Sequence, residues 1–183
     1  NMTVEETNLK GCFVITPNVI KDERGYFFES FNKAQFETKT GRMTSFIQDN
    51  QSRSSAGVLR GLHFQTEEFS QAKLVRVIKG KVLDVCVDLR KESATFGKHL
   101  SIILDNIKHR QLYIPKGFAH GFLVLEDDTV FSYKCDNYYN KASEKGIIYN
   151  DETLNIDWCF QKEDLILSEK DKALPTFETY FNE

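Results

Sequence analysis

The sequence predicts a mainly β protein, a β-sandwich or small barrel with a few short helices. Apolar and polar residues alternate with period two through most of the chain, which is typical of half-buried strands. The alternating segments are short and turn signals separate them, which favours packed antiparallel sheets. The 183 residues contain no internal repeat or linker-like stretch and predict one domain over 1–183.

Two helical segments interrupt this pattern. The first is expected over residues 33–40, because Asn32 is a good N-cap with Gln35 as its N3 partner, and Gly41 is a typical C-terminal stop. A second, shorter helical piece is expected near residues 168–173.

The expected strands follow in chain order. GVLRGLHFQ forms the first, and KLVRVIKGKVLDVCVDL forms two strands joined at Lys79-Gly80, after which HLSIIL and RQLYIP add two more. HGFLVL and TVFSYKC predict a hairpin with Glu126-Asp127-Asp128 at its turn. In the strand after Gly80, one face carries Leu83, Val85, Val87 and Leu89, and the other carries Val82, Asp84, Cys86 and Asp88.

Composition and charge argue against several classes of protein. A net charge of −3 gives no general attraction to nucleic acid. No apolar stretch approaches the ~18 residues that span a bilayer, and the polar, acidic N-terminal stretch lacks the features of a secretory signal. We therefore expect no membrane partner and a cytoplasmic location. The four cysteines are far apart and form no CxxC, so neither a zinc site nor a disulfide framework is expected.

His63 and His120 stand out among the four histidines. Each is flanked by glycine and apolar residues, in RGLHFQ and PKGFAHGF. His99 and His109 adjoin basic residues instead, and we expect them at solvated strand ends without a role. Taken alone, either His63 or His120 is more often a satisfied core residue than a working one.

Four other polar residues in apolar strands favour a functional role for these histidines: Arg60, Lys73, Asp84 and Tyr133. Buried charges are costly unless they are paired or used, so a cavity that holds a charged ligand would explain these residues together. Arg60 and His63 are three residues apart and would face opposite sides of a regular strand. A bulge at Gly61 would bring both to one side.

Proton transfer by His, Tyr and Lys is the chemistry that remains. Two histidines without an obvious carboxylate partner make a poor metal site, and Gln65 stands where a metal-binding barrel would have a second imidazole, so no metal is expected. The chain has no G-x-S-x-G elbow, no G-x-G-x-x-G and no Walker loop, so we expect no serine nucleophile of that type and no dinucleotide or P-loop site.

At these residues the chain resembles the dTDP-4-dehydrorhamnose 3,5-epimerases. The resemblance extends from about residue 9 to about residue 175 and is carried by several blocks in the family's order: DERGYFFESF, FIQDNQSRSSAGVLRGLHFQ, QAKLVRVIKGKVLDVCVDLRKESATFGKH, LYIPKGFAHGFLVL, YKCDNYYNKASEKGI and ILSEKDKALP. It implies a cupin-type jelly-roll β-sandwich that works as a homodimer, without metal or cofactor, on a nucleotide sugar in dTDP-rhamnose biosynthesis.

The resemblance implies four catalytic roles. His63 matches the general base, and Asp171 matches the carboxylate that orients it. Tyr133 matches the acid that returns a proton from the opposite face, and Lys73 matches the group that stabilises the enolate oxygen. These residue types suit the chemistry, because a proton beside a ketone is acidic only when the charge that develops on the oxygen is stabilised. Inversion also requires an acid on the face opposite the base.

The resemblance also implies the substrate contacts. Arg24 and Glu29 match nucleotide-contacting positions that are often supplied across the dimer. Positions near the diphosphate and sugar match Gln48, Asn50 and Arg60, and further pocket positions match His120, Tyr139, Glu144 and Lys170. Three departures from the family pattern bear on sugar or nucleotide preference: Gln51 in place of histidine, Tyr113 in place of tryptophan and Lys141 in place of proline.

The implied reaction is the 3,5-epimerisation of dTDP-4-dehydro-6-deoxy-D-glucose to dTDP-4-dehydro-L-rhamnose. Two alternatives within the same chemistry are epimerisation at C3 only, and epimerisation of another nucleotide sugar, such as a GDP-linked one. Two alternatives from other classes are a non-catalytic sugar-nucleotide-binding cupin and a metal-dependent cupin oxygenase or isomerase. The presence of both His63 and Tyr133 argues against the binding module.

Overall fold

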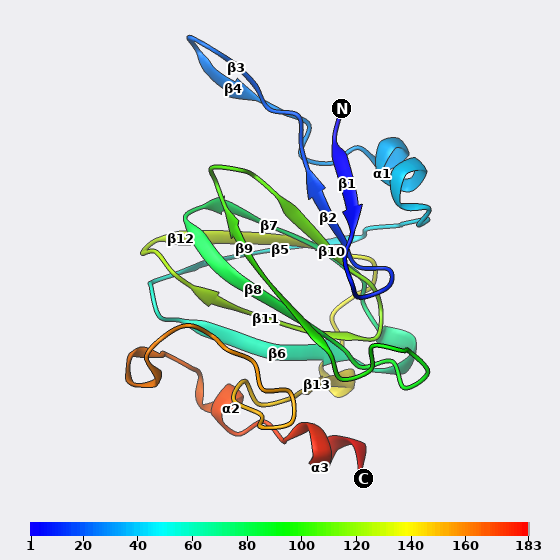
Figure 1. Ribbon diagram of the computed structural model, residues 1–183, viewed down its shortest axis with the longest axis vertical. Helices are drawn as coiled ribbons and strands as arrows, with labels where there is room; N and C mark the ends of the chain where they lie inside the picture. Colours follow the sequence, from blue (N-terminus) through cyan, green and yellow to red (C-terminus); the bar gives the residue numbers. More distant parts are fainter. Residues whose placement is uncertain (183) are drawn as a thin grey trace.

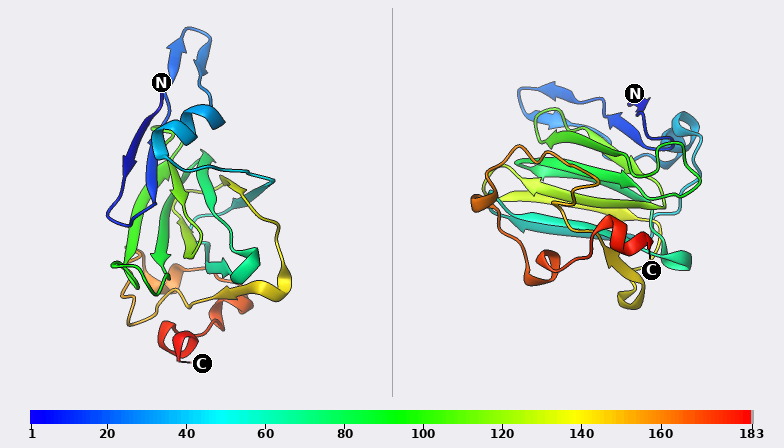
Figure 2. Two further views of the ribbon diagram at one scale, coloured as in Figure 1. Left: turned by 90° about the vertical axis from the view of Figure 1, so that its right-hand side faces the viewer. Right: turned by 60° about the horizontal axis from the view of Figure 1, so that its bottom comes forward.

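Two antiparallel sheets face each other in the computed structural model, which describes residues 1–182 (Figure 1). This arrangement confirms the predicted β-sandwich with short helices. Residues 147–182, here called the C-terminal segment, lie beneath the smaller sheet in Figure 1. A narrow hairpin projects from the opposite end of the molecule (Figures 1 and 2).

The larger sheet contains six strands in the order β1-β2-β10-β7-β12-β5. Their bounds are β1 (Thr3–Glu6), β2 (Phe13–Thr16), β10 (Gln111–Ile114), β7 (Lys73–Lys79), β12 (Thr129–Cys135) and β5 (Gln48–Ser54). The smaller sheet contains five strands in the order β13-β6-β11-β8-β9. Their bounds are β13 (Glu144–Gly146), β6 (Leu59–Gln65), β11 (Phe118–Val124), β8 (Lys81–Asp88) and β9 (His99–Asp105).

The predicted hairpin between residues 120 and 135 is wrong. β11 and β12 follow each other through the turn at residues 126–128, but β11 pairs with β6 and β8, whereas β12 pairs with β5 and β7. β7 and β8, which meet at Gly80, likewise lie in different sheets. Each of these turns therefore carries the chain from one sheet to the other. Alternation cannot reveal this, because a strand has the same period in either sheet.

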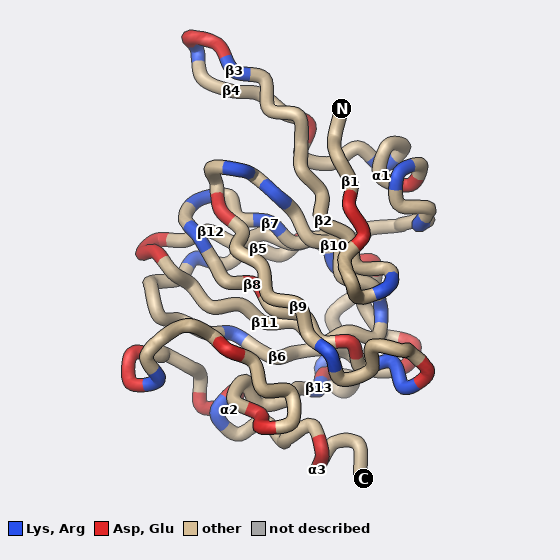
Figure 3. Tube along the Cα trace, in the orientation of Figure 1, with Lys and Arg blue, Asp and Glu red and all other residues tan. Residues whose placement is uncertain are grey.

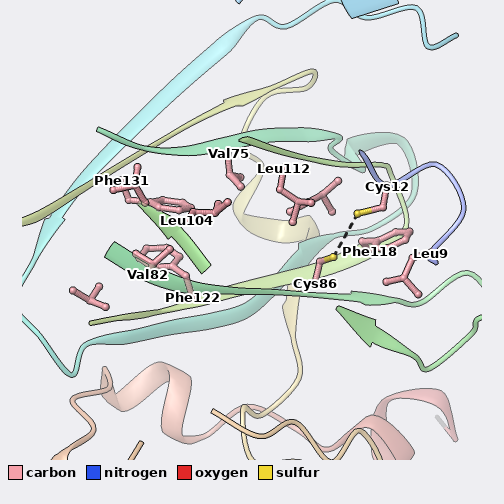
Figure 4. Close-up of a cluster of buried hydrophobic side chains, with 13 residues drawn as sticks. Leu9, Cys12, Val75, Val82, Cys86, Leu104, Leu112, Phe118, Phe122 and Phe131 are labelled. Atoms are coloured by element: carbon pink, nitrogen blue, oxygen red, sulfur yellow. Dashed lines mark hydrogen bonds between the residues drawn. The ribbon is translucent and has the colours of Figure 1, made fainter. Parts of the chain in front are cut away.

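Part of the space between the sheets is filled by apolar side chains from both of them (Figure 4). Val82 and Cys86 of β8 lie in the same cluster as Val75 and Phe131 of the facing sheet. The thiols of Cys12 and Cys86 are 3.8 Å apart there, and all four cysteines are free. The predicted division of β8 into two faces is thus confirmed, and the face that carries Val82, Asp84 and Cys86 is turned toward the other sheet.

The other face of β8 packs against the C-terminal segment. Leu83, Val85 and Val87 belong to a second cluster with Trp158 and Phe177. Because both faces of β8 are covered, every residue of this strand after Lys81 is buried. The charged side chains Asp84 and Asp88 of this strand are therefore shielded from bulk water.

The two predicted helical segments are confirmed. α1 (Lys33–Thr40) begins where Oδ1 of Asn32 accepts a hydrogen bond from the N–H of Gln35 at 3.1 Å, and it ends at Gly41, whose φ of 71° is left-handed. α2 (Glu169–Lys172) begins where the Ser168 hydroxyl accepts from the N–H of Asp171. The remaining helical elements are α3 (Phe177–Phe181) and short 3-10 turns at Glu67–Phe69, Lys141–Ser143 and Lys162–Asp164.

The projecting hairpin consists of β3 (Ile20–Asp22) and β4 (Gly25–Phe27). Charged residues of both signs lie at its tip, and others are spread along much of the chain (Figure 3). The chain that follows β4 returns to the body of the molecule, where His109 lies 5.0 Å from the Tyr26 ring and 4.8 Å from the Phe28 ring, between centroids.

The expectation that His99 and His109 are solvated is wrong for His109, which is buried, and His99 is half-buried. His109 lies between β9 and β10 with a left-handed φ of 58°, and its imidazole packs on the hairpin instead of facing water. Basic neighbours in the sequence are no guide to exposure at such a turn.

Candidate active site

A cavity of about 570 Å³ lies between the two sheets. This volume lies within the range of small-molecule sites. The sheets and the C-terminal segment provide its lining: Asn50, Gln51, Ser52, Val58, Leu59, Arg60, His63, Lys73, His120, Phe122, Tyr133, Ile166, Leu167, Ser168, Lys170 and Asp171. The structure therefore gathers eight of the thirteen predicted site residues around one space: Asn50, Arg60, His63, Lys73, His120, Tyr133, Lys170 and Asp171.

A bulge in β6 brings Arg60 and His63 to the same side. His63 pairs with His120 of β11 and Arg60 pairs with Phe122, so two residues of β6 stand opposite the single residue Gly121. Gly61 has a φ of +124°, and a Cβ there would lie 2.6 Å from the Cα of Gly121. Only glycine fits this contact, which confirms the predicted bulge at Gly61.

His63 is held by a carboxylate from the C-terminal segment. Nε2 of His63 lies 2.7 Å from Oδ1 of Asp171, and the other oxygen, Oδ2, accepts a hydrogen bond of 3.0 Å from the N–H of Gly61. Burial raises the pKa of Asp171, but the hydrogen bonds from His63 and Gly61 outweigh it and hold that pKa below its ordinary value. The carboxylate therefore stays ionised and orients the imidazole, as in other His-carboxylate pairs.

Lys73 of β7 and Tyr133 of β12 reach the cavity from the other sheet. Nζ of Lys73 lies 5.5 Å from the centre of the Tyr133 ring. Burial lowers the pKa of Lys73. Burial also raises the pKa of Tyr133, and a hydrogen bond with Asn50 offsets only part of that rise. The phenol therefore keeps its proton at neutral pH. The His63 imidazole and the Tyr133 phenol enter one cavity from different sheets.

His120 is the second imidazole of the cavity, and it also carries a carboxylate partner. Nε2 of His120 lies 2.7 Å from Oδ1 of Asp84, and both side chains are buried. Burial lowers the pKa of His120, an effect that Asp84 opposes only in part. This imidazole is therefore neutral under ordinary conditions.

A smaller pocket adjoins the cavity and holds three more of the predicted residues. Gln48, Tyr139 and Glu144 line it, together with Asn50, His63, Lys73 and Tyr133 of the main cavity. Glu144 accepts hydrogen bonds from Lys170 and from the Tyr139 hydroxyl, which ties α2 to the loop that precedes β13. The two spaces therefore form a continuous polar site.

Arg24 and Glu29 are not brought to this cavity. Arg24 lies at the tip of the projecting hairpin, where it forms an ion pair with Asp22 and its side chain is 87% exposed. Glu29 lies at the base of that hairpin and accepts a hydrogen bond from Asn32. Neither residue lines the main cavity of this chain.

Several lining residues were missed by sequence reasoning. Gln51 was noted only as a departure from the family pattern, and Ser52, Ile166, Leu167 and Ser168 were not singled out. Ser52 could have been predicted from its spacing, because it lies two residues from Asn50 on a strand and therefore shares the face of Asn50. Residues 166–168 have no such signal, because an irregular segment carries no periodicity. Tyr113 and Lys141 do not line the cavity.

Residues 1–182 contain no cluster of three or more His, Cys, Asp or Glu side chains placed to hold a metal ion. In the same residues, no helix is long and apolar enough to cross a membrane.

Comparison with known proteins identifies relatives over nearly the whole chain. A profile of the dTDP-4-dehydrorhamnose 3,5-epimerase family matches residues 6–179. The dTDP-4-dehydrorhamnose 3,5-epimerase of Escherichia coli K12 is 51% identical over 177 residues, which cover 97% of this chain and 95% of the relative.

Solved structures give the same result. The crystal structure of dTDP-4-dehydrorhamnose 3,5-epimerase from Elizabethkingia anophelis superposes with a TM-score of 0.94 at 52% identity, over 97% of both chains. The dTDP-6-deoxy-D-glucose-3,5-epimerase from Legionella pneumophila, in complex with dTDP-4-keto-L-rhamnose, superposes with a TM-score of 0.93 at 45% identity, over 97% of this chain and 94% of that one.

Proposed function

Because this chain belongs to the dTDP-4-dehydrorhamnose 3,5-epimerase family, we propose that its inter-sheet cavity is the epimerisation site and that His63 is the base. The reaction is the 3,5-epimerisation of dTDP-4-dehydro-6-deoxy-D-glucose to dTDP-4-dehydro-L-rhamnose, a step of dTDP-rhamnose biosynthesis. The enzyme is an isomerase.

One observation carries the assignment of roles: an oriented imidazole and a protonated phenol enter the same cavity from different sheets. His63, oriented by Asp171, removes a proton from a carbon beside the C4 ketone, and the electron pair moves to the ketone oxygen. The Lys73 ammonium stabilises the resulting enolate oxygen. Tyr133 then delivers its proton to the opposite face of that carbon.

After each inversion, His63 carries one extra proton and Tyr133 lacks one. Exchange of both groups with water restores them, so each inverted carbon acquires a hydrogen from solvent. Two rounds, at C3 and at C5, give the product. Every proton transfer in this scheme is assigned to a side chain of the protein.

The remaining polar residues suit the rest of a nucleotide sugar. Arg60 has a guanidinium that matches the diphosphate oxygens, and Asn50, Gln48 and His120 offer hydrogen bonds to the sugar. Tyr139 is an exposed aromatic ring on which a nucleobase can stack, beside the Glu144–Lys170 ion pair. A nucleotide sugar is strongly charged and does not cross membranes unaided, so we propose that the enzyme works in the cytoplasm. We also propose that the chain works as one domain.

The hairpin supports a homodimer. Its Ile20, Tyr26 and Phe27 side chains are exposed although they are large and apolar, and the hairpin extends away from its own sheets (Figure 2). Apolar groups gathered on a projecting element are typical of a protein-protein contact. We propose that the hairpin of one subunit reaches the cavity of its partner, where Arg24 and Glu29 contact the nucleotide.

A heterodimer tests this arrangement. One subunit carries Arg24→Ala and the other carries His63→Ala, and two affinity tags isolate the mixed dimer. Only one of its two sites then combines an intact hairpin with an intact base, so we expect about half of the wild-type kcat/KM, well above either homodimeric variant. A monomer in sedimentation, or a mixed dimer no more active than the two variants, would contradict the proposal.

NMR in heavy water tests the reaction itself. Wild-type protein is mixed with dTDP-4-dehydro-6-deoxy-D-glucose, and loss of the proton signals at C3 and C5 is followed as deuterium replaces them. We expect both signals to disappear as the product forms. Deuterium exchange at C3 alone would indicate a monoepimerase. If neither this substrate nor a GDP-linked 4-keto sugar exchanged any proton, the protein would be a binding module.

A further inference from the structure

Asp84 is a buried carboxylate to which the mechanism above gives no role. It lies in the middle of β8, its side chain is 0% exposed, and one of its oxygens pairs with His120. The other oxygen, Oδ2, has no hydrogen-bond partner among residues 1–182. A buried carboxylate with an unsatisfied oxygen destabilises a fold, so a functional reason for its presence is expected.

Lys73 is the matching unpaired cation. Its side chain is buried and lines the cavity, and it forms no ion pair with a carboxylate of the described residues. The groups that face it come from four strands: Tyr133 and Cys135 on β12, Asp84 on β8, His120 on β11 and Glu144 on β13. The charge of Lys73 therefore depends on which of these groups is negative.

Among residues 1–182, Asp84 is the carboxylate near Lys73 that no other cation neutralises. Burial raises the pKa of Asp84, and its contacts with His120 and Lys73 oppose that rise. Burial raises the pKa of Cys135 to about 11, so this thiol is uncharged at neutral pH. Glu144 is already paired with Lys170. His120 is neutral and donates its Nε2 proton to Asp84, so it does not cancel the charge of the carboxylate. Asp84 is therefore the carboxylate near Lys73 that can balance its charge.

We propose that Asp84 is a positioning residue of the epimerase: its carboxylate fixes the orientation and tautomer of His120, and its charge keeps Lys73 protonated for the enolate oxygen. The inference rests on the function proposed above. With Nε2 bound to Asp84, Nδ1 of His120 carries the lone pair and accepts a hydrogen bond from a substrate hydroxyl.

The pH dependence of the Asp84→Asn variant tests this role. Burial already lowers the pKa of Lys73, and the nearby Asp84 charge opposes that effect. Without the charge the pKa of Lys73 falls further, so the ammonium form is lost at lower pH. We expect the alkaline limb of the kcat profile to move toward lower pH by about one unit or more.

Asp88→Asn is the matched control, because Asp88 is equally buried in the same strand but binds Arg90, Ser93 and Thr95 outside the cavity. It should change thermal stability and leave the pH profile as in the wild type. An Asp84→Asn enzyme with the wild-type profile would overturn the inference, whereas an inactive wild type would overturn the proposed function instead.

A double variant covers the case in which Asp84→Asn fails to fold. If Asp84 balances the charge of Lys73, adding Lys73→Met removes the uncompensated cation and should raise the melting temperature above that of Asp84→Asn alone. A double variant that melts no higher than Asp84→Asn would refute the charge pairing.

Discussion

Replacing His63 with alanine is expected to stop deuterium incorporation at both C3 and C5 and to lower kcat by about 10³-fold. Among the described residues that line the cavity, the His63 imidazole is the group that an ionised carboxylate of the C-terminal segment, Asp171, orients. Alanine leaves the Asp171 carboxylate in place but removes the base. Both carbons depend on this base, because each must lose a proton before it can be inverted.

His99→Ala is the matched control. His99 begins β9, is half-buried and does not line the cavity, so its loss removes an imidazole without touching the proposed chemistry. We expect wild-type exchange from this variant in the same heavy-water measurement. Full exchange at either carbon by a folded His63→Ala protein would exclude His63 as the base at that carbon.

Strand positions could be predicted from the sequence, whereas strand partners could not. The alternation in residues 73–89 correctly divides them at Gly80 and assigns the two faces of β8. It says nothing of the sheet to which each strand belongs, so the chain crossings at Gly80 and at residues 126–128 were not foreseen. Partners are set by long-range packing, which local period does not encode.

β5 was not predicted for a physical reason. Its sequence, QDNQSRS, contains no apolar residue: Asn50, Gln51 and Ser52 line the polar cavity, and alternate residues of the strand are exposed. Hydrophobic periodicity finds strands that bury apolar groups, and it fails at a strand that builds a polar site. β5 was thus harder to find than the apolar strands that line the same cavity.

Only some residues of the candidate site could be predicted from residue type and strand position. Of the polar residues within apolar strands, Arg60, Lys73 and Tyr133 line the cavity, whereas Asp84 pairs with His120, which also lines it. Asp171, in contrast, is 108 residues from His63 and sits in a short polar helix, so only the family resemblance connected the two. Contacts between segments so distant in the chain leave no local pattern.

Removing the hydroxyl of Tyr133 is expected to separate proton removal from inversion. Phenylalanine keeps the ring that packs against Phe131 and His120, so the shape of the cavity is preserved. Burial raises the pKa of Tyr133 and keeps the phenol protonated, and this is the proton that the variant lacks. His63 can still form the enolate, so exchange continues, but we expect inversion at C5 to fall by about 10²-fold.

Tyr113→Phe is the matched control for this variant. Tyr113 is also a buried tyrosine whose pKa burial raises, but it packs with Phe13 and Phe36 on the outer side of the larger sheet, away from the cavity. Its product should have the wild-type stereochemistry. If Tyr133→Phe gives the same product at the wild-type rate, the proton that completes inversion comes from another donor. His63 and Tyr133 would still line the same cavity from different sheets, but Tyr133 would not be the acid of the reaction.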